Sequence, residues 1–439
     1  GDCGACTVIV VEEGAEGPLL KTTNSCIQFL PTLDGKALIT VEGLRGENGE
    51  LHPAQQAMID EHGSQCGFCT PGFVMSLYAL YNTNDAPARQ DIDDALAGNL
   101  CRCTGYRPII AAAQSMYSTG DKAAAADVKG QLEEVARNED LVIECGDRRY
   151  FAPRDLCAFA RTYEQYPDAT ILAGGTDIGL WVTKQHRHLR TIIYAGRVAE
   201  MGVLEKTKTH LHIGGAVTLD AAASALVAEY PGLDELFRRF ASPAIRSAGT
   251  LGGNIANGSP IGDSMPALMV LGATLVLRKG EDEREIALDE FYHDYMVSDL
   301  QPGEFVARIR VPRAEKAVVV GSQKWSKRFD QDISAVCTAY RLQLDGDKVA
   351  GFRMACGGLA ATVKRATHCE DVVVGAPWSE ATVAAACAAL KQDFTPISDM
   401  RASADIRLLV VQNLLRRFHL ETTGEAPETV YTYGRQGSR

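Results

Sequence analysis

The sequence has no long apolar run and no block of basic residues. A membrane-spanning helix needs roughly 20 consecutive apolar residues, and no stretch of the 439-residue chain approaches that length. The 44 Lys and Arg residues are outnumbered by 56 Asp and Glu, which gives a net charge of −12. This balance disfavours nucleic acid as a partner. We therefore expect a cytoplasmic globular protein that binds neither membrane nor nucleic acid.

Cysteine is the residue type that stands out among those present. The chain has 13 cysteines, several of them gathered in glycine-rich loops. In a large chain with a soluble composition, this grouping indicates metal binding rather than a disulfide framework.

The length of the chain predicts two to four domains. Residues 1–50 alternate short strands with loops, and residues 51–117 change to helical periodicity. Residues 118–148 are rich in small and charged side chains and predict a linker. Residues 149–316 have an α/β pattern, and residues 317–425 alternate strands with two helices, around 379–392 and 402–420.

The first two segments contain more specific signals. We expect a strand at 7–13 and a turn followed by a strand at 34–44. Four helices are predicted in the second segment, over residues 52–63, 70–83, 89–99 and 106–117.

The first ten residues, GDCGACTVIV, contain a pair of cysteines three positions apart. Cys3, Cys6 and the later Cys26 match the last part of the plant-type cysteine spacing that holds a 2Fe-2S cluster. That spacing requires a further cysteine three residues before Gly1, so we expect the ferredoxin-like domain to be N-terminally incomplete. The alternative is a pair of buried structural cysteines beside a strand.

A second set of cysteines lies in QCGFCTPG and CRCTGYRP. Cys66 and Cys69 precede one predicted helix, and Cys101 and Cys103 precede another. Helix N-termini present free N–H groups and a positive dipole end, which favour anionic thiolates. Two such helix starts can enclose one metal centre at the end of a four-helix bundle. A four-cysteine zinc site uses similar pairs and remains the alternative.

These motifs, together with NLCRCTGYRPI, resemble the iron–sulfur portion of the xanthine dehydrogenase/aldehyde oxidase (molybdenum hydroxylase) family. The resemblance implies two 2Fe-2S clusters. It gives one cluster three of its four ligands, Cys3, Cys6 and Cys26, and the other all four, Cys66, Cys69, Cys101 and Cys103. It also places Gln65 near the molybdopterin of a partner subunit.

The second half of the chain has two loops suited to a flavin. ILAGGTDIGLWV (171–182) places adjacent glycines between an apolar strand and an apolar run, and Gly, Ser, Thr and Asn crowd the long loop at 240–268. Neither loop carries the Gly-x-Gly-x-x-Gly fingerprint, which disfavours a Rossmann domain. They resemble the FAD domain of the same family, which has the vanillyl-alcohol-oxidase-type fold.

The resemblance also implies individual flavin contacts. The diphosphate loop would comprise Ile171, Leu172, Ala173, Gly174, Gly175, Thr176, Asp177 and Ile178. Further FAD contacts would be Phe240, Thr250, Asn254, Asp263, Val306 and Lys324, with Asn257 and Ser259 in the same loop as Asn254. NAD would dock near Asp177 and Tyr295, although Met296 stands where the family pattern has Arg.

The expected fold class is α+β multidomain. It would comprise a ferredoxin-like β-grasp remnant, a four-helix 2Fe-2S bundle, a vanillyl-alcohol-oxidase-type FAD domain and a C-terminal flavoprotein domain. The expected function is that of the small iron–sulfur/FAD subunit of a bacterial xanthine dehydrogenase in purine metabolism. A molybdopterin-binding large subunit would pair with it in a heterotetramer with two of each subunit.

In that function, electrons would pass from the partner's molybdenum site through the helical-domain cluster, then the ferredoxin-like cluster, to FAD and then to NAD. No side chain of this chain is a clear catalytic acid or base. Two alternatives remain: the same subunit of an enzyme that oxidises aldehydes, nicotinate or carbon monoxide, and a zinc- and flavin-binding scaffold without redox activity.

We expect the other cysteine, arginine and histidine motifs to have structural roles. We expect the other six cysteines to be buried thiols without a ligand role: Cys145, Cys157, Cys337, Cys356, Cys369 and Cys387. The RRF triplets at 238–240 and 416–418 are interpreted as surface charge on helices. The alternation in HLHIG (210–214) predicts a strand with one solvated face.

Overall fold

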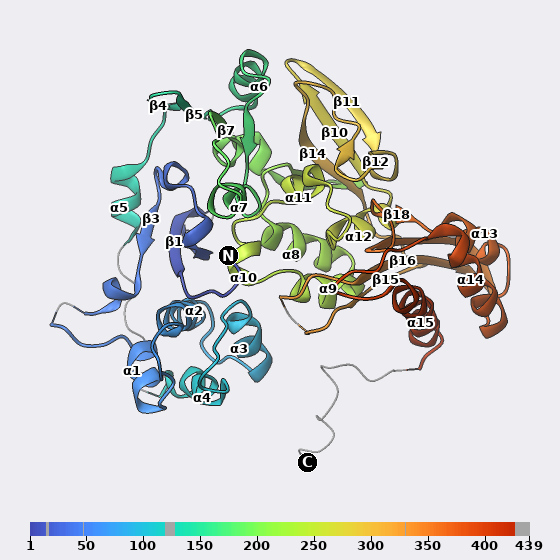
Figure 1. Cartoon of the computed structure of the whole chain (residues 1–439), viewed down its shortest axis with the longest axis horizontal. Coiled ribbons are helices and arrows are strands. Elements are labelled where there is room, and N and C mark those ends of the chain that lie inside the picture. Colours follow the sequence, from blue (N-terminus) through green and yellow to red (C-terminus); the bar gives the residue numbers. More distant parts are fainter. Residues whose placement is uncertain (15–16, 47, 119–127, 330, 426–439) are drawn as a thin grey trace. The chain divides into compact units, whose positions relative to one another are not determined.

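The computed structural model describes residues 1–14, 17–46, 48–118, 128–329 and 331–425 (Figure 1). The chain divides into two compact units, which are described separately. The first unit contains residues 1–199, 218–220 and 241–250. The second unit contains residues 200–217, residues 221–240 and the chain from residue 251 onward.

The first unit begins with a three-stranded antiparallel sheet in the order β2-β1-β3. The strand predicted at 7–13 forms, whereas the one predicted within 34–44 is only three residues long because a 3-10 helix begins after one intervening residue. The strands are β1 (Thr7–Gly14), β2 (Gly17–Asn24) and β3 (Ala37–Ile39), and the 3-10 helices are η1 (Ser25–Ile27), η2 (Leu30–Leu33) and η3 (Val41–Leu44).

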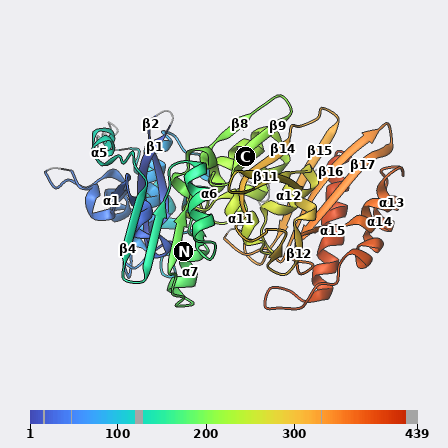
Figure 2. The ribbon, with the colours of Figure 1, turned by 90° about the horizontal axis from the view of Figure 1, so that it is seen from above.

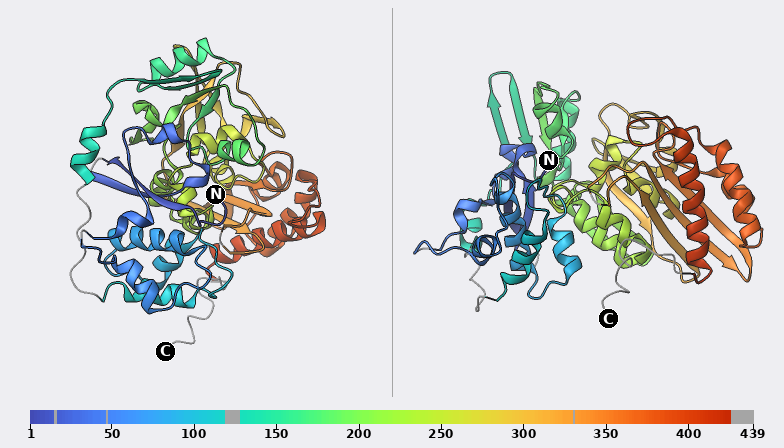
Figure 3. Two further views of the ribbon diagram at one scale, coloured as in Figure 1. Left: turned by 60° about the vertical axis from the view of Figure 1, so that its left-hand side comes forward. Right: turned by 60° about the horizontal axis from the view of Figure 1, so that its bottom comes forward.

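The four predicted helices of the second segment all form, as α1 (Pro53–Asp60), α2 (Thr70–Thr83), α3 (Arg89–Leu96) and α4 (Arg107–Ser115). Helix α2 is the central helix, since its apolar residues are buried on nearly every side. One hydrophobic core joins this bundle to the sheet, and its members include Ile9, Met58, Phe73, Leu77 and Ile109. Figure 3 (left) shows the bundle in blue below the sheet.

The segment predicted as a linker contains regular structure. Helix α5 (Val128–Val135) places Leu132 in the core of the sheet and bundle, and β4 (Leu141–Cys145) starts the next sheet. The composition is that of a linker, but one buried leucine and its neighbour Val128 are enough to attach a short amphipathic helix. Residues 119–127 of the predicted linker lie outside the described residues.

A four-stranded sheet in the order β4-β5-β7-β6 completes the first unit. Strand β7 pairs in parallel with both β5 and β6, whereas β4 and β5 form an antiparallel hairpin. Its remaining elements are β5 (Arg148–Ala152), α6 (Leu156–Gln165), β6 (Thr170–Leu172), α7 (Ile178–Thr183), β7 (Thr191–Tyr194), η4 (Ala195–Arg197) and α10 (Pro243–Arg246). The glycine-rich stretch at 173–177 is therefore the loop between β6 and α7.

The second unit contains a five-stranded antiparallel sheet in the order β11-β10-β14-β9-β8. Its strands are β8 (Leu204–Lys206), β9 (His210–Gly214), β10 (Thr274–Lys279), β11 (Asp282–Ala287) and β14 (Phe305–Pro312), and β12 (Tyr292–Asp294) and β13 (Val297–Ser298) form a separate hairpin. The helices are η5 (Ala199–Gly202), α8 (Leu219–Glu229), η6 (Pro231–Leu233), α9 (Asp234–Arg239), α11 (Leu251–Asn257), α12 (Ser264–Leu271) and η7 (Leu288–Glu290). In β9, buried Leu211 and Ile213 alternate with partly exposed His210 and His212, as predicted.

The C-terminal part of the second unit is a four-stranded antiparallel sheet in the order β15-β16-β17-β18. Its strands are β15 (Val318–Trp325), β16 (Val336–Asp345), β17 (Lys348–Gly357) and β18 (Lys364–Arg365). Helices α13 (Thr367–Val373), α14 (Glu380–Asp393) and α15 (Ala404–Thr422) cover one face of it (Figures 2 and 3). Tyr340 of β16 stacks on Phe418 of α15 with ring centroids 4.4 Å apart. Two of these helices were predicted and the short α13 was not.

The described elements therefore have the predicted mixed α+β class in several domains. Within the described part of the chain, no helix combines the length and the apolar character that a bilayer crossing needs.

Candidate functional site

The four cysteines of the helical bundle lie in two loops, each leading into a helix. Cys69 is the N-cap residue of α2, and Cys101 and Cys103 lie just before α4. Pro71 and Pro108 occupy the second position of these helices, where a missing backbone N–H costs nothing. The structure thus brings together the pairs that the spacing predicted to meet at the ends of two helices.

The four thiols are arranged as two contacting pairs. Cys69 and Cys101 lie close enough for their side chains to hydrogen-bond, and so do Cys66 and Cys103. Burial, with the neighbouring Cys101, raises the pKa of Cys69 to about 11. Burial also disfavours the thiolate of Cys101, but hydrogen bonds from the Thr104 side chain and backbone outweigh it and lower the pKa of Cys101.

This pairing bears on which metal centre fits. Among the described residues, no three His, Cys, Asp or Glu side chains converge as the ligands of a single metal ion would. A tetrahedral zinc ion draws all four sulfurs to the same distance from one another. A 2Fe-2S cluster instead takes two thiolates at each of two irons. The contacts between Cys69 and Cys101 and between Cys66 and Cys103 fit a cluster held by two thiolates at each iron.

The N-terminal loop brings a third pair of thiols together. Cys6 and Cys26 are neighbours, although 20 positions separate them, because Ser25 donates to the Cys6 carbonyl through its backbone N–H, at 3.2 Å, and its hydroxyl, at 2.9 Å. Burial raises the pKa of Cys6. Cys3 is exposed in the same loop, and its carbonyl oxygen accepts a hydrogen bond from the Leu100 N–H. These contacts bring the Cys6 and Cys26 thiols together, and a role of Cys3 as a third ligand stays a prediction.

The predicted residue Gln65 and its neighbour Phe68 are both exposed. Gln65 lies in an exposed stretch ahead of α2, and the ring of Phe68, between Cys66 and Cys69, is exposed as well. Access from solvent suits a residue that reaches a cofactor held by a partner, and this role of Gln65 stays a prediction.

The predicted diphosphate loop connects buried Leu172 of β6 to α7 and packs against Ala248 and Gly249 of the same unit. A Cβ on Gly174 would overlap the Ala248 carbonyl oxygen, so only glycine fits there. Gly175 has φ of +71°, in the left-handed region that favours glycine.

Hydrogen bonds fix the end of the loop that leads into α7. The Gly175 carbonyl accepts the Gly179 N–H at 2.7 Å at the start of α7, and the carboxylate of Asp177 accepts from the indole N–H of Trp181 at 3.0 Å. Thr250 is buried beside this loop region and pairs with Thr218 in an isolated β-bridge. Neighbouring backbone thus leaves no room for a side chain at Gly174. The left-handed conformation of Gly175 is one that backbone loops around phosphate groups use.

A buried ion pair forms the centre of the predicted flavin contacts in the second unit. Lys324 Nζ lies 2.7 Å from Asp263 Oδ2, and both side chains are only 2% exposed. The Ser334 hydroxyl donates to Asp263 Oδ1 at 2.6 Å, and Lys324 also donates to the Arg239 carbonyl at 3.1 Å. Such a pair persists in the interior only because each charge is matched and hydrogen-bonded.

The same contacts gather several predicted residues. Lys324 donates to the carbonyl of Arg239, the residue before Phe240. The side-chain oxygen of Asn254 accepts a 2.6 Å hydrogen bond from the hydroxyl of Ser264, the residue after Asp263. Phe240, Asn254, Asp263 and Lys324 therefore belong to one region. Val306 is buried in β14, and Tyr295 is 62% exposed at the turn between β12 and β13.

Sequence reasoning missed some residues and misplaced others. Arg239 is buried, not surface charge: its guanidinium donates to the carbonyls of Phe329 and Lys324 and lies over the Phe329 ring. Cys145 and Cys157 are exposed, against expectation, because one lies in an edge strand and the other near the start of α6, whereas the other four cysteines of that group are buried. Asn99 opens the motif NLCRCTGYRPI, but neither Asn99 nor Ser334 was predicted as a site residue.

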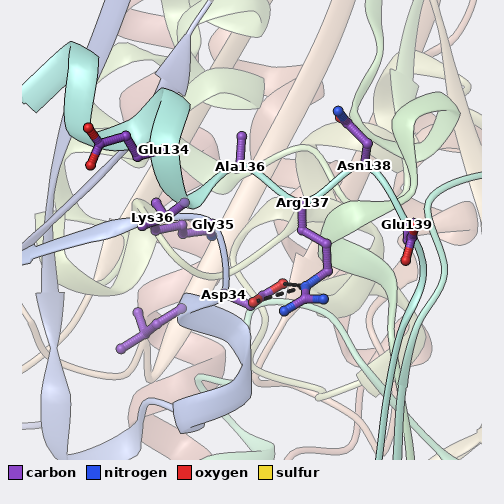
Figure 4. Close-up of a pocket in the computed structure, with 10 residues that line it drawn as sticks. Asp34, Gly35, Lys36, Glu134, Ala136, Arg137, Asn138 and Glu139 are labelled. Atoms are coloured by element: carbon purple, nitrogen blue, oxygen red, sulfur yellow. Dashed lines mark hydrogen bonds and ion pairs between the residues drawn. The ribbon is translucent and has the colours of Figure 1, made fainter.

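One polar pocket lies apart from all predicted site residues. It is lined by residues 33–36 and 134–139 of the first unit (Figure 4). Its central carboxylate, Asp34, is paired with Arg137 at 3.0 Å and Arg197 at 2.7 Å. Since Asp34 is already neutralised by these partners, the pocket presents no free carboxylate there to a ligand.

Three family models match the chain. They are described as [2Fe-2S] binding domain, over residues 40–114, FAD binding domain in molybdopterin dehydrogenase, over 144–314, and CO dehydrogenase flavoprotein C-terminal domain, over 322–422. The chain is 31% identical to xanthine dehydrogenase of Emericella nidulans over 90% of its own length and 34% of the relative's. It is 30% identical to xanthine dehydrogenase/oxidase of Gallus gallus, over 90% of the chain and 35% of the relative.

The structure also resembles solved ones. A chain of reconstituted CO dehydrogenase from Oligotropha carboxidovorans matches with a TM-score of 0.59 at 25% identity, over 63% of this chain and 97% of that one. The curated relatives are much longer, and the chain spans about a third of their length.

Proposed function

The chain belongs to the xanthine dehydrogenase/aldehyde oxidase family of molybdenum hydroxylases, with 2Fe-2S-binding and FAD-binding domains, and we propose that it carries electrons from a molybdenum centre to FAD. The observation that carries the proposal is that one chain contains both a flavin domain and paired thiols at the N-termini of two helices. Thiolate clusters exchange single electrons, and a bound flavin exchanges either one electron or a pair as hydride.

The roles of this chain's residues follow from that proposal. Cys66, Cys69, Cys101 and Cys103 would hold one cluster, and Cys3, Cys6 and Cys26 would hold three positions of the other. The loop at 171–178 would bind the FAD diphosphate through backbone N–H groups. The buried Lys324 and Asp263 pair would fix the walls of the flavin region, since neither charge can move without losing its partner.

The partner and substrate are proposed from the relatives. Curated relatives of this chain are named xanthine dehydrogenase, and each is about three times longer than the matched region. We propose that a molybdopterin-binding large subunit completes the enzyme, that Gln65 approaches its cofactor and that xanthine is the substrate class. NAD is the proposed acceptor, reached near Asp177 and Tyr295. Two copies of each subunit would form the heterotetramer.

The test is to purify the protein with whatever chain accompanies it. With the cysteine that the spacing requires three residues before Gly1 in place, we expect about four irons per chain, the content of two 2Fe-2S clusters, one FAD, and molybdenum in the accompanying chain. Xanthine should reduce NAD in this preparation.

Other outcomes separate the alternatives. Oxidation of an aldehyde, nicotinate or carbon monoxide but not xanthine would keep the electron-transfer role and replace the substrate. Zinc in place of iron would refute the electron-transfer role itself.

A further inference from the structure

The two cysteine loops of the first unit are in direct contact, although about 95 positions separate them in the sequence. The Leu100 N–H donates a 2.9 Å hydrogen bond to the carbonyl oxygen of Cys3. Leu100 directly precedes Cys101, a predicted ligand of the other cluster. A backbone hydrogen bond thus joins a predicted ligand of one cluster to the residue next to a predicted ligand of the other.

Asn99 holds this contact in place. Its side-chain amide donates to the Gly4 carbonyl at 3.1 Å and to the Thr7 hydroxyl at 3.4 Å, and its carbonyl oxygen accepts from Ser76 of α2 at 2.7 Å. The Asn99 residue is 5% exposed and Ser76 is 4% exposed. One buried side chain therefore ties the N-terminal loop, the bundle and the Cys101 loop together.

Glycines bring the backbones close enough for this network. A Cβ on Gly4, which has φ of +68°, would overlap the Gly98 carbonyl, and a Cβ on Gly72 would overlap the Gly4 carbonyl. No side chain separates the two loops at this point. The loops meet backbone to backbone, and Asn99 is the side chain that fixes their register.

The contact provides a nearly continuous bonded route between sulfurs. It runs from Cys101 Sγ through its own backbone nitrogen and the Leu100 residue, across the hydrogen bond to the Cys3 carbonyl, and on to Cys3 Sγ. Only the hydrogen bond interrupts the covalent chain. An electron tunnels more readily along bonds and hydrogen bonds than across a gap filled only by packing.

We propose that Asn99 is a positioning residue that holds the Cys3 carbonyl on the Leu100 N–H and so sets the rate of electron transfer between the two clusters. This inference rests on the proposed function. The step moves one electron: the cluster of the bundle is oxidised by one electron, and the cluster of the N-terminal loop is reduced by one. No bond breaks and no proton moves.

The test compares Asn99→Ala with Asn82→Ala in the full-length protein carrying both clusters. Asn82 also lies in the bundle, but its side chain donates only to the Tyr78 carbonyl one turn earlier in α2. Each protein is partly reduced by a flash-generated reductant, and the redistribution of the electron between the clusters is followed by optical and electron paramagnetic resonance spectra. Hydrogen exchange of the Leu100 amide is measured on the same samples.

For Asn99→Ala we expect iron content equal to that of the unsubstituted protein, Leu100 exchange at least about ten-fold faster and redistribution slowed at least about ten-fold. The magnetic interaction between the two reduced clusters should also weaken. Asn82→Ala should match the unsubstituted protein. Ser76→Ala removes only the hydrogen-bond donor to Asn99 and should change the Leu100 exchange rate and the redistribution rate in the same direction by a smaller factor. This variant replaces Asn99→Ala in the test if Asn99→Ala does not fold.

Three results would overturn the inference. One is an unchanged redistribution rate in Asn99→Ala while Leu100 exchange has increased. Another is full protection of Leu100 in that variant. The third is loss of folding in both Asn99→Ala and Ser76→Ala, which would make the network a determinant of the fold alone. Absence of iron from the unsubstituted protein would refute the proposed function, and this inference with it.

Discussion

Cys101 receives hydrogen bonds from Thr104 that favour its thiolate, and it contacts Cys69. Replacing it by serine exchanges a soft thiolate for a harder and less acidic ligand. We expect Cys101→Ser to lower iron by about two per chain, the content of one 2Fe-2S cluster, as measured by metal analysis. Cys157→Ser is the control, because Cys157 is exposed and outside both loops. Unchanged iron in Cys101→Ser would remove Cys101 from the ligand set.

His52 couples the stability of the bundle to pH. Its Nδ1 accepts the Ala54 N–H at 3.1 Å and caps α1, and its ring lies edge-on to Tyr78 and Tyr81 at 4.9 and 5.1 Å. Only a neutral imidazole has a nitrogen that can accept. Burial lowers the pKa of His52 to about 4.

The sign of the pH effect follows from that lowered pKa. The folded-state pKa lies below the ordinary value of 6.5, so the contribution of His52 to the free energy of unfolding is complete above pH 6.5 and is lost as pH falls toward 4. His52→Asn keeps a capping side chain that does not titrate. The melting temperature of this variant should fall less steeply between pH 6.5 and 4, measured by circular dichroism. His62→Asn, at an exposed position, is the control, and equal slopes in His52→Asn and the unsubstituted protein would contradict the prediction.

At the residue scale, the sequence was informative where the chemistry is local. The meeting of the cysteine pairs was predictable because each pair has a short, fixed spacing just before a helix. Asn99 and Arg239 were not, because their partners, Gly4 and Phe329, are about 90 or more positions away. A single Asn or Arg in the sequence carries no sign of such a partner.

At the scale of elements, the loop between β6 and α7 is the feature most sensitive to small changes. Alanine at Gly175 adds a Cβ with ordinary contacts, 3.5 Å from Leu172 and from Phe29, so its effect comes from the backbone. The left-handed conformation costs a non-glycine residue about 1–2 kcal/mol. We expect FAD affinity of Gly175→Ala to fall about ten-fold, which corresponds to about 1.4 kcal/mol, in a flavin fluorescence titration.

Substitutions at two further glycines serve as a stronger variant and as a control. Gly174→Ala should release FAD altogether, because its Cβ would overlap the Ala248 carbonyl. Gly146→Ala should leave FAD bound, because Gly146 has φ of +62° in open space at the turn between β4 and β5. The diphosphate assignment is wrong if Gly174→Ala keeps its flavin with normal affinity.

The hairpin of β12 and β13 presents the Tyr295 ring to solvent. If nicotinamide stacks on this ring, removing it costs about 1 kcal/mol of binding, roughly a five-fold rise in the KM for NAD. Tyr295→Ala should keep its FAD and its electron delivery to an artificial dye. Val319→Ala, another exposed apolar residue of the second unit, is the control. An unchanged KM for NAD in Tyr295→Ala would exclude the hairpin from the NAD site.

Element prediction succeeded where the apolar pattern was long. The four bundle helices and the two C-terminal helices each carry several apolar residues at helical spacing, and all of them form. Helix α5 was missed because Leu132 is its one fully buried anchor in a segment of small and charged residues. Strand β3 is shorter than predicted because η3 begins after a single intervening residue. Short elements depend on tertiary contacts that no local pattern records.

At the scale of the whole molecule, the chain combines a [2Fe-2S] binding domain with an FAD binding domain. The proposed path uses both clusters only for electrons that arrive from the molybdenum partner. NADH, in contrast, can reduce a bound flavin directly, and the flavin can pass electrons to a dye. Under this proposal, the two routes would have different requirements within one chain.

Cys101→Ser separates these routes in the complete enzyme. We expect its oxidation of substrate with NAD to fall at least about 100-fold, because the first electron carrier of the path is missing, while NADH-to-dye activity stays within about two-fold of normal. Gly174→Ala should lose both activities, since both need the flavin. Both activities are measured on one preparation with known iron, FAD and molybdenum contents. Substrate-to-NAD turnover that survives in Cys101→Ser, with its iron lowered by about two, would mean that electrons bypass the bundle cluster, and the proposed order of carriers would be wrong.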